Sequence, residues 1–336
     1  MESEKKFRFT KKTALCALGA VGILIVGAVT LFSEKNDMDA VRFYAMDTSV
    51  SVKTLGDVDK AYQKKVKELD GLLDCYDKES EIFRLNKNGE AKLSENTSEL
   101  LEKAYELTLK YPQCDITAGA LIDLWDVTGN PKVPNDEEIK KALSEMGIER
   151  LSHSEREWKL SGGKVNLGCC AKGYACDVLK EMFEEKGEKC AIASFGSSSV
   201  LYGKKPDGEK FTVAIKNPLD SDKSIGVLET DQCFVSTSGG YERFFEVDGK
   251  KYSHIFDLET GKPAETDLLS VTVIGQNGTE SDFLSTCIYI TGTKELPKWL
   301  LSKDFSVIAV DENKNVYVSE ALKDSFELKD KAFTLR

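Results

Sequence analysis

The sequence predicts one globular domain that mixes helices with strands and follows a single N-terminal transmembrane helix. Its 336 residues are ample for a buried core, and 41% hydrophobic with 31% charged residues is an ordinary globular composition. Segments with helical and strand periodicity follow one another without an internal repeat, a low-complexity linker or a second globular unit. An uncharged, mostly apolar segment stands apart from them near the start.

This apolar segment covers residues 13–32 and is predicted to cross a membrane, since a helix of that length spans about 30 Å. Basic residues precede it and acidic residues follow it, so the positive-inside rule places the start of the chain in the cytoplasm. A cleaved signal peptide or a lipoprotein anchor fits less well, because the segment is long and Cys16 lies at its start. We therefore expect a single-pass protein of the cell membrane, with a cytoplasmic basic tail at 1–12, a transmembrane signal anchor at 13–32, a linker at 33–41 and an extracytoplasmic domain at 42–336.

Charge and cysteine usage exclude several classes of protein. The net charge is −11, and because the first twelve residues carry +3, the rest of the chain carries −14. Such an acidic body does not suit nucleic acid or anionic lipid as a partner, but it is compatible with a bound divalent cation. The nine cysteines show no paired metal-ligand spacing and no HExxH motif occurs, so a zinc site is not expected. Most of the cysteines are expected to be small core residues.

Residues 42–55 are expected to form the first strand, with Val50 and Val52 on one face. Residues 58–73 are expected to form an amphipathic helix that covers a sheet. Later elements are a helix from Ser94 or Thr97 to Lys110, a short helix capped by Asp136, a hairpin of 158–160 with 164–166 over Gly162 and Gly163, strands at 191–195 and 269–274, a helix opening at 280, and a closing hairpin of 305–310 with 315–318.

The most distinctive stretch reads V-S-T-S-G-G-Y-E-R-F-F at 235–245. An apolar strand enters a turn rich in hydroxyls and glycines, and Asp248 and Gly249 then reverse an aromatic strand into a hairpin that returns His254. Backbone N–H groups without neighbouring Cβ atoms can bind an anion, so this turn is a candidate ligand site. An ordinary turn would have a similar composition, and spacing alone leaves both interpretations open.

Two other stretches carry candidate chemistry. Residues 166–177 read N-L-G-C-C-A-K-G-Y-A-C-D, which predicts a strand, a glycine turn and a helix whose N-terminus and Lys172 would favour an anion. Asp282 and Thr286 are four residues apart on a predicted helix, so their oxygens share one face and suit a hard cation. Taken alone, such a pair more often consists of two solvent-exposed side chains that bind no metal.

These stretches resemble the ApbE family, the FAD:protein FMN transferases, over residues 42–318. The family pattern T-S-G-x-Y-E-R-x-F followed by Y-x-H-I-x-D-x-x-T-G matches 237–261, and D-L-G-G-I-A-K-G-Y-A-x-D matches 166–177. Asp47, Asn166 and Leu258 stand where the family has glycine, aspartate and proline. Further matches are M-G-T at 46–48, S-x-Y-x-x-x-S-E-I-x-R-L-N at 74–86, F-D-I-T-V-G-P-L-x-x-L-W at 114–125 and A-D-x-x-x-T at 281–286.

The resemblance implies a fold, a reaction and partners. The fold would be α+β, a single ApbE-like domain related to the T-fold, with mixed sheets flanked by helices. FAD would be the substrate and Mg²⁺ the cofactor, and FMN would pass from FAD to a threonine hydroxyl of another protein through a phosphoester bond, with AMP released. Because the domain is expected outside the membrane, the acceptors would be exported or membrane-attached flavoproteins.

The resemblance also implies roles for individual residues. The magnesium ligands would be Asp282, Thr286 and the backbone carbonyl of about Cys169. His254 would take the threonine proton or only hydrogen-bond the pocket, Asp257 would orient ligand or metal, and Lys172 would assist with its charge. The residues implied to contact FAD are Met46, Tyr76, Thr117, Ala118, Gly119, Asn166, Lys172, Thr237, Ser238, Gly239 and Ile255.

Two other functions remain open on the sequence. Water could replace threonine at the same site, which would make the protein an FAD pyrophosphatase that yields FMN and AMP. The protein could also bind FAD without catalysis.

Overall fold

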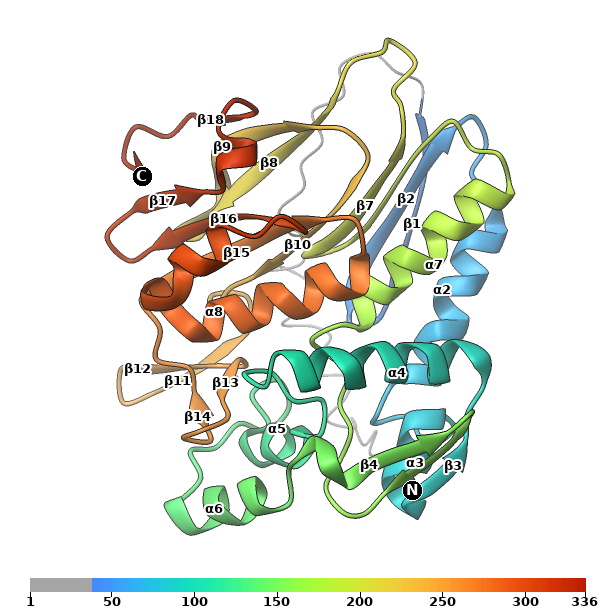
Figure 1. Cartoon of the computed structure of the whole chain (residues 1–336), viewed down its shortest axis with the longest axis vertical. Helices are drawn as coiled ribbons and strands as arrows, with labels where there is room; N and C mark the ends of the chain where they lie inside the picture. The colour runs from blue at the N-terminus through green and yellow to red at the C-terminus, as the bar shows by residue number, and fades with distance from the viewer. Residues whose placement is uncertain (1–37) are drawn as a thin grey trace, which may run out of the picture.

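The computed structural model describes residues 38–336, and its centre is a nine-stranded sheet (Figure 1). Neighbouring strands in this sheet are antiparallel except for the last pair, β17 and β19, which is parallel. The predicted strands at 191–195 and 269–274 and the closing hairpin are confirmed as β6, β15 and β16–β17. In sheet order the strands are β1 (Met38–Ala45), β2 (Thr48–Leu55), β6 (Cys190–Phe195), β7 (Ser198–Gly203), β10 (Cys233–Ser238), β15 (Leu268–Gly275), β16 (Ser306–Asp311), β17 (Asn315–Val318) and β19 (Thr334–Leu335).

The expected single strand at 42–55 is wrong, because the structure has a hairpin there. β1 and β2 pair in register from Met38 with Leu55 to Ala45 with Thr48, and Met46 and Asp47 form the turn with φ of 52° and 54°. A two-residue hairpin turn of type I′ needs positive φ at both positions, and neither residue gives the glycine signal that marks such a turn. Val50 and Val52 are fully buried, as the alternation predicted. The first strand starts at Met38, inside the range expected to be linker.

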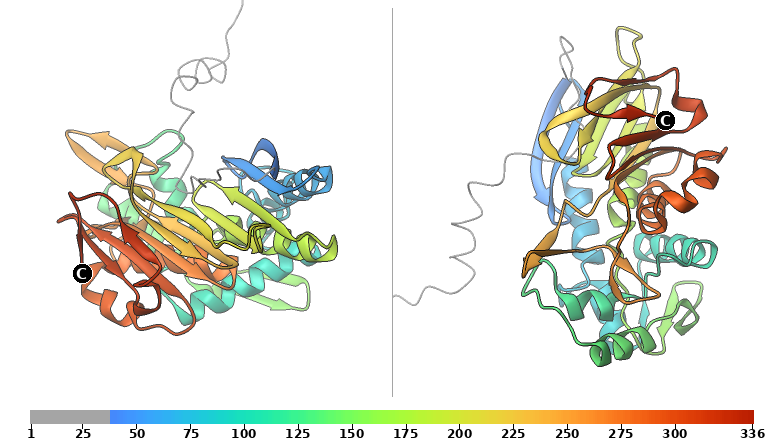
Figure 2. Two further views of the ribbon diagram at one scale, coloured as in Figure 1. Left: turned by 90° about the horizontal axis from the view of Figure 1, so that it is seen from above. Right: turned by 90° about the vertical axis from the view of Figure 1, so that its left-hand side faces the viewer.

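Three helices cover one face of the large sheet, and α2, α7 and α8 lie side by side across it in Figure 1. The amphipathic helix is confirmed as α2 (Lys60–Leu73), whose buried residues are the predicted Tyr62, Val66, Leu69 and Leu73. α7 spans Ala171–Glu185 and α8 spans Gly278–Leu300. The opposite face packs on a small sheet of β18 (Phe326–Leu328), β9 (Asp220–Thr230) and β8 (Phe211–Asn217), and Figure 2 shows the two layers from the side.

The lower half of Figure 1 holds the remaining helices around a three-stranded sheet. The expected hairpin of 158–160 with 164–166 is wrong: Trp158 pairs with His153, and their rings stack 4.2 Å apart. The predicted helix to Lys110 is confirmed and has Ser94 at its N-cap position, without a capping hydrogen bond from the side chain, and Asn135 rather than Asp136 caps the short helix. The elements there are α3 (Glu81–Asn88), α4 (Glu95–Lys110), α5 (Gly119–Trp125), α6 (Asp136–Ser144), β3 (Glu90–Lys92), β4 (Leu151–Ser154), β5 (Glu157–Leu160) and the 3₁₀ turn Ile148–Arg150. A second 3₁₀ turn, Glu320–Leu322, lies between β17 and β18.

Two small hairpins follow β10 and connect these two regions. The predicted hairpin over Asp248 and Gly249 is confirmed as β11 (Phe244–Val247) and β12 (Lys250–Ser253). β13 (Phe256–Asp257) and β14 (Lys262–Pro263) form the second. Trp125 of α5 is buried, donates to the Gly261 carbonyl at 3.0 Å and contacts the rings of Phe245 and Tyr252, so it anchors both hairpins to α5.

The described residues contain no helix long and apolar enough to cross a membrane. The predicted transmembrane helix at 13–32, the basic tail at 1–12 and most of the expected linker lie outside them.

The helical layer provides a test of the core. Leu69 of α2 is fully buried against the sheet. We expect Leu69→Ala to lower the free energy of unfolding by about 2–5 kcal/mol, because it removes a packed side chain and leaves a cavity. Lys67→Ala on the exposed face of the same helix should change that free energy by less than about 0.5 kcal/mol. Urea unfolding of both variants measures the difference, and equal losses would contradict this assignment of faces.

Candidate functional site

The site begins where α7 crosses α8. A Cβ atom on Gly173 would lie 2.1 Å from the Gly278 carbonyl oxygen, and one on Gly278 would lie 2.3 Å from the Gly173 carbonyl oxygen. Only glycine at both positions lets the two backbones approach so closely. The buried carboxylate of Asp177 on α7 then accepts bonds from the N–H groups of Gly278 and Thr279, at 2.6 and 2.9 Å, which holds the start of α8 against α7.

This crossing places Asp282 of α8 at the start of α7. Its Oδ2 accepts the Gly173 N–H at 2.9 Å and its Oδ1 accepts the Ser198 hydroxyl at 2.8 Å. The carboxyl group is 3% exposed, so burial raises its pKa, while Lys172, with Nζ 3.7 Å from Oδ2, acts in the opposite direction. A buried carboxylate with one partly exposed lysine is a place where a further cation would be stabilised.

Hydroxyl groups extend this oxygen-lined region. The Ser238 hydroxyl at the end of β10 bonds to those of Ser285 at 2.7 Å and Thr286 at 3.1 Å, and Ser285 donates to the Asp282 carbonyl. The structure therefore brings the predicted metal residue Thr286 and the predicted FAD contact Ser238 into direct contact, and Asp282, one helical turn earlier on α8, joins them through its backbone carbonyl and the Ser285 hydroxyl. The side-chain donors are all oxygen, which fits Mg²⁺ and not a softer metal.

Among residues 38–336 no three His, Cys, Asp or Glu side chains gather in an arrangement suited to a metal. The predicted magnesium set is of another kind, with one carboxylate, one hydroxyl and one carbonyl. Cys169, which would supply the carbonyl, lies just before α7, close enough to Asp282 for its thiol to affect the pKa of that carboxyl. The eight cysteines of the described chain are all free, and all except Cys169 are buried, as expected for core residues.

His254 directly follows β12 and lies close enough to Lys172 for the charge of that lysine to affect its pKa. Its Nδ1 is 3.1 Å from the Arg243 carbonyl oxygen, an acceptor, so Nδ1 carries the proton and Nε2 holds the free electron pair. Burial and the charges of Arg243 and Lys172 lower the pKa of His254 to about 4. The imidazole is therefore neutral at physiological pH and able to accept a proton.

The β1–β2 turn is held near His254 by two contacts from distant parts of the chain. The Asp70 carboxylate accepts the Met46 N–H at 2.9 Å, and the Arg243 guanidinium donates to the Asp47 carbonyl at 3.2 Å. Since the Arg243 carbonyl also bonds to His254, one residue joins the Met46 turn to the histidine. Asp47 replaces the family glycine here without loss of the turn, because aspartate tolerates positive φ.

Three other predicted FAD contacts, Tyr76, Gly119 and Asn166, lie around or close in sequence to Lys164. The Lys164 ammonium bonds to Asp123 at 2.6 Å and lies 4.3 Å from the centre of the exposed Tyr76 ring, whose hydroxyl also bonds to Asp123. The Gly119 N–H donates to the Lys164 carbonyl at 2.9 Å, which brings α5 to the same place. Asn166 uses its amide oxygen to accept the Gly168 N–H at 2.9 Å.

Several predicted residues have structural roles. The Thr117 hydroxyl bonds to Asp115 and Gly147, and both carboxylate oxygens of Asp257 bond within its own turn, to the Glu259 N–H and the Thr260 hydroxyl. The protein's own atoms fill the space beside the small residues: a Cβ on Gly119 would lie 2.5 Å from the Lys164 carbonyl, and one on Gly239 would lie 2.5 Å from the Tyr241 ring. Ala118, Thr237 and Ile255 are buried.

Sequence reasoning missed Ser198, Ser285, Arg243 and the pair Asp123 and Lys164. Arg243 lies inside the motif at 235–245, and this position was the sequence signal that could have identified it as a site residue. The hydroxyl partners of Asp282 could be found only once strand pairing was known, because Ser198 pairs with Ser236 across β7 and β10.

A family model described as the ApbE family matches residues 46–309, which is most of the chain. The chain belongs to the ApbE family.

Individual relatives agree with this membership. Curated proteins named FAD:protein FMN transferase from Salmonella typhimurium and Escherichia coli are 27% and 28% identical, and the matches cover 78% and 73% of this chain and 79% and 74% of those proteins. The structure of the ApbE protein from Thermotoga maritima matches with a TM-score of 0.79 and 28% identity, and that of flavin transferase ApbE from Vibrio cholerae with 0.75 and 26%. Each structural match covers 86% of this chain and 99% of the other, so the mixed α+β domain of the ApbE family is confirmed.

In this ApbE-family chain the crossing of α7 and α8 can be tested directly. Gly278→Ala would drive a methyl group into the Gly173 carbonyl. We expect it to lower the free energy of unfolding by about 1–3 kcal/mol, as overpacking does. The control is Gly71→Ala in α2, where nothing lies within 4 Å of the new methyl group, so this variant should gain about 0.4–1 kcal/mol. Thermal unfolding of both variants is the measurement, and a neutral Gly278→Ala would contradict the crossing.

Proposed function

We propose that this protein transfers FMN from FAD to a threonine hydroxyl of an acceptor protein and releases AMP. The observation that carries the proposal is the meeting of buried Asp282, Lys172 at the start of α7 and a neutral His254 in one site. The curated relatives named FAD:protein FMN transferase give it further support.

The reaction is a phosphoryl transfer to the acceptor threonine that breaks a phosphorus–oxygen bond of the FAD diphosphate. The threonine oxygen would form a bond to the phosphorus of the FMN half, and the bond from that phosphorus to the bridging oxygen would break. The bridging oxygen leaves with AMP, and the threonine proton passes to a base. Negative charge grows on the leaving phosphate, so the main demand on the protein is electrostatic stabilisation.

Residues of this chain would meet these demands. Lys172 and the positive N-terminal end of α7 face the region where the leaving phosphate would lie. Nε2 of His254 would take the threonine proton, since the Arg243 carbonyl fixes the proton on Nδ1. Asp282, Thr286 and the Cys169 carbonyl would hold Mg²⁺, which when bound supplies positive charge to the diphosphate. Tyr76 presents an exposed ring on which the flavin would stack.

The location and acceptors belong to the proposal as well. The apolar segment at 13–32 would anchor the protein in the cell membrane, with the domain on the outer side. Its acceptors would then be exported or membrane-attached flavoproteins of electron transfer that carry a target threonine.

Replacement of Asp282 tests the reaction. We expect Asp282→Asn to lower FMN attachment on the order of 100-fold or more, because the site loses its buried negative charge and with it the cation. The measurement is mass spectrometry of an exported acceptor co-expressed with the full chain. Asp231→Asn, in the exposed turn before β10, is the matched control and should label the acceptor normally. Release of AMP at full rate without any acceptor would instead favour FAD hydrolysis, and retention of uncleaved FAD with Mg²⁺ would favour a carrier.

The pH profile tests the role of His254. Its pKa is lowered to about 4, so it is already deprotonated at pH 5.5 and the transfer rate should change less than about twofold between pH 5.5 and 7.5. A base with the ordinary histidine pKa of about 6.5 would lose most of its activity over this interval as pH falls. His254→Ala should cost about 100-fold or more at every pH. A rate that falls with a midpoint near 6.5 would contradict the lowered pKa of His254.

A further inference from the structure

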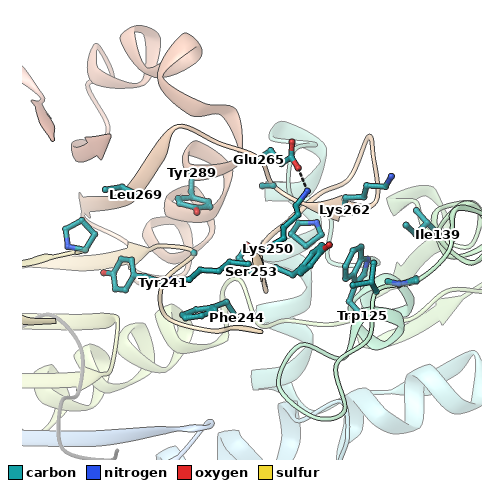
Figure 3. Close-up of a pocket in the computed structure, with 18 of the residues that line it drawn as sticks. Trp125, Ile139, Tyr241, Phe244, Lys250, Ser253, Lys262, Glu265, Leu269 and Tyr289 are labelled. Carbon is teal, nitrogen blue, oxygen red and sulfur yellow. Dashed lines mark hydrogen bonds and ion pairs between the residues drawn. The ribbon is translucent and has the colours of Figure 1, made fainter. Parts of the chain in front are cut away.

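A cleft of about 600 Å³ lies beside the site and has no place yet in the reaction (Figure 3). Its lining includes Gly240, which follows the predicted ligand residue Gly239, and Ser253, which precedes His254. Two lining residues of the cleft are therefore direct chain neighbours of residues proposed for the reacting centre. None of the residues predicted to contact FAD lines it.

The cleft exposes apolar side chains from three separate segments. Val133 before α6, Leu219 in the β8–β9 turn and Phe244 of β11 all line it and are 46%, 56% and 42% exposed. Large side chains exposed in one place beside a reacting centre are typical of a surface that binds another protein.

One wall of the cleft is an unpaired strand edge. Residues Lys250–Ser253 of β12 all line the cleft, and within the described chain β12 pairs only with β11. The His254 N–H donates to the Arg243 carbonyl, and hydrogen-bonded pairs in an antiparallel ladder recur at every second residue. The backbone groups of Lys251 and Ser253 therefore point to the free edge. Such an edge accepts an extended peptide as an added strand.

The charges of the cleft favour a segment that carries an acidic group. Lys250 is paired with Glu265 at 2.8 Å and Lys262 with Asp136 at 3.2 Å. Lys251 has no carboxylate within 4 Å in residues 38–336, and its ammonium lies 4.7 Å from the centre of the Phe244 ring. One lysine on the cleft wall thus remains available for a partner.

We propose that this cleft binds an extended segment of the acceptor protein, which adds to the free edge of β12 and carries the target threonine to His254. The segment would place apolar side chains on Leu219 and Phe244 and an acidic side chain near Lys251. This inference rests on the proposed function, because it names where that function's acceptor binds.

The test uses peptides of 15 residues, each centred on one threonine of the exported proteins of the same genome, with the full chain, FAD and Mg²⁺. Leu219→Glu and Phe244→Glu are compared with Leu301→Glu, the same change at an exposed leucine beyond α8. We expect each cleft variant to raise the peptide concentration for half-maximal labelling at least tenfold, with FAD affinity unchanged within twofold. The control should behave like the unmodified protein. Leu219 lies outside the β11–β12 hairpin, so its variant stays informative if Phe244→Glu disturbs that hairpin.

The outcomes separate the two proposals. Failure of the unmodified protein to label any peptide, together with failure to label whole exported proteins, contradicts the transferase function. Labelling that Leu219→Glu and Phe244→Glu leave at the level of Leu301→Glu overturns the docking site alone. A parallel loss of FAD affinity in both cleft variants would assign the cleft to FAD and also overturn it.

Strand addition has its own readout. Methylation of alternate backbone nitrogens of the best-labelled peptide should block labelling at every second position, where the N–H would bond to β12. Equal effects at all positions would contradict pairing with the strand edge.

Discussion

The close contact between the backbones of α7 and α8 is the constraint on which the site depends. Gly173 and Gly278 leave no room for a side chain, and each of the two carboxylates of this crossing bonds to a backbone N–H of the other helix. Asp177 on α7 holds the start of α8, and Asp282 on α8 holds the start of α7. A buried carboxylate is costly unless it is fully bonded, so these reciprocal bonds fix the helices at one separation. The carboxylate predicted for the cation and the helix end predicted for the phosphate are thereby part of one rigid contact.

Reactive groups reach this contact from segments that are far apart in the sequence. Strand pairing brings Ser198 and Ser238 to α8, because β7 and β10 are neighbours in the sheet. Arg243 then connects the β11–β12 hairpin to the β1–β2 turn through Asp47, and its carbonyl orients His254. The sheet thus supplies the fixed part of the site, and the β11–β12 hairpin supplies the proposed base His254 together with the strand edge proposed to bind the acceptor.

The sequence predicted elements where the local signal agreed with the tertiary structure. The burial of Tyr62, Val66 and Leu69 followed from helical spacing alone. Prediction failed where the local signal is weak: Met46 has positive φ in the β1–β2 turn, where the distant Asp70 carboxylate accepts its N–H, and methionine gives no local sign of such a turn. The glycine pair at 162 and 163 gave a strong turn signal, yet the hairpin forms around Glu155, where the stacking of His153 on Trp158 fixes the pairing.

Glycine and charge both show why site chemistry cannot be inferred from composition. The glycines at 239 and 240 suggested a cradle for a ligand, but Tyr241 and Tyr289 occupy the space that they leave, so their first role is to let the protein pack on itself. The body of the chain is strongly acidic, whereas Lys172, Lys216 and Arg243 all lie close enough to the Glu242 carboxylate for their positive charges to act on it, and Lys172 also pairs with Asp282. Screening limits the reach of surface charges to about 10 Å at moderate salt, so these three cations, and not the distant acidic surface, set the potential that a diphosphate would meet.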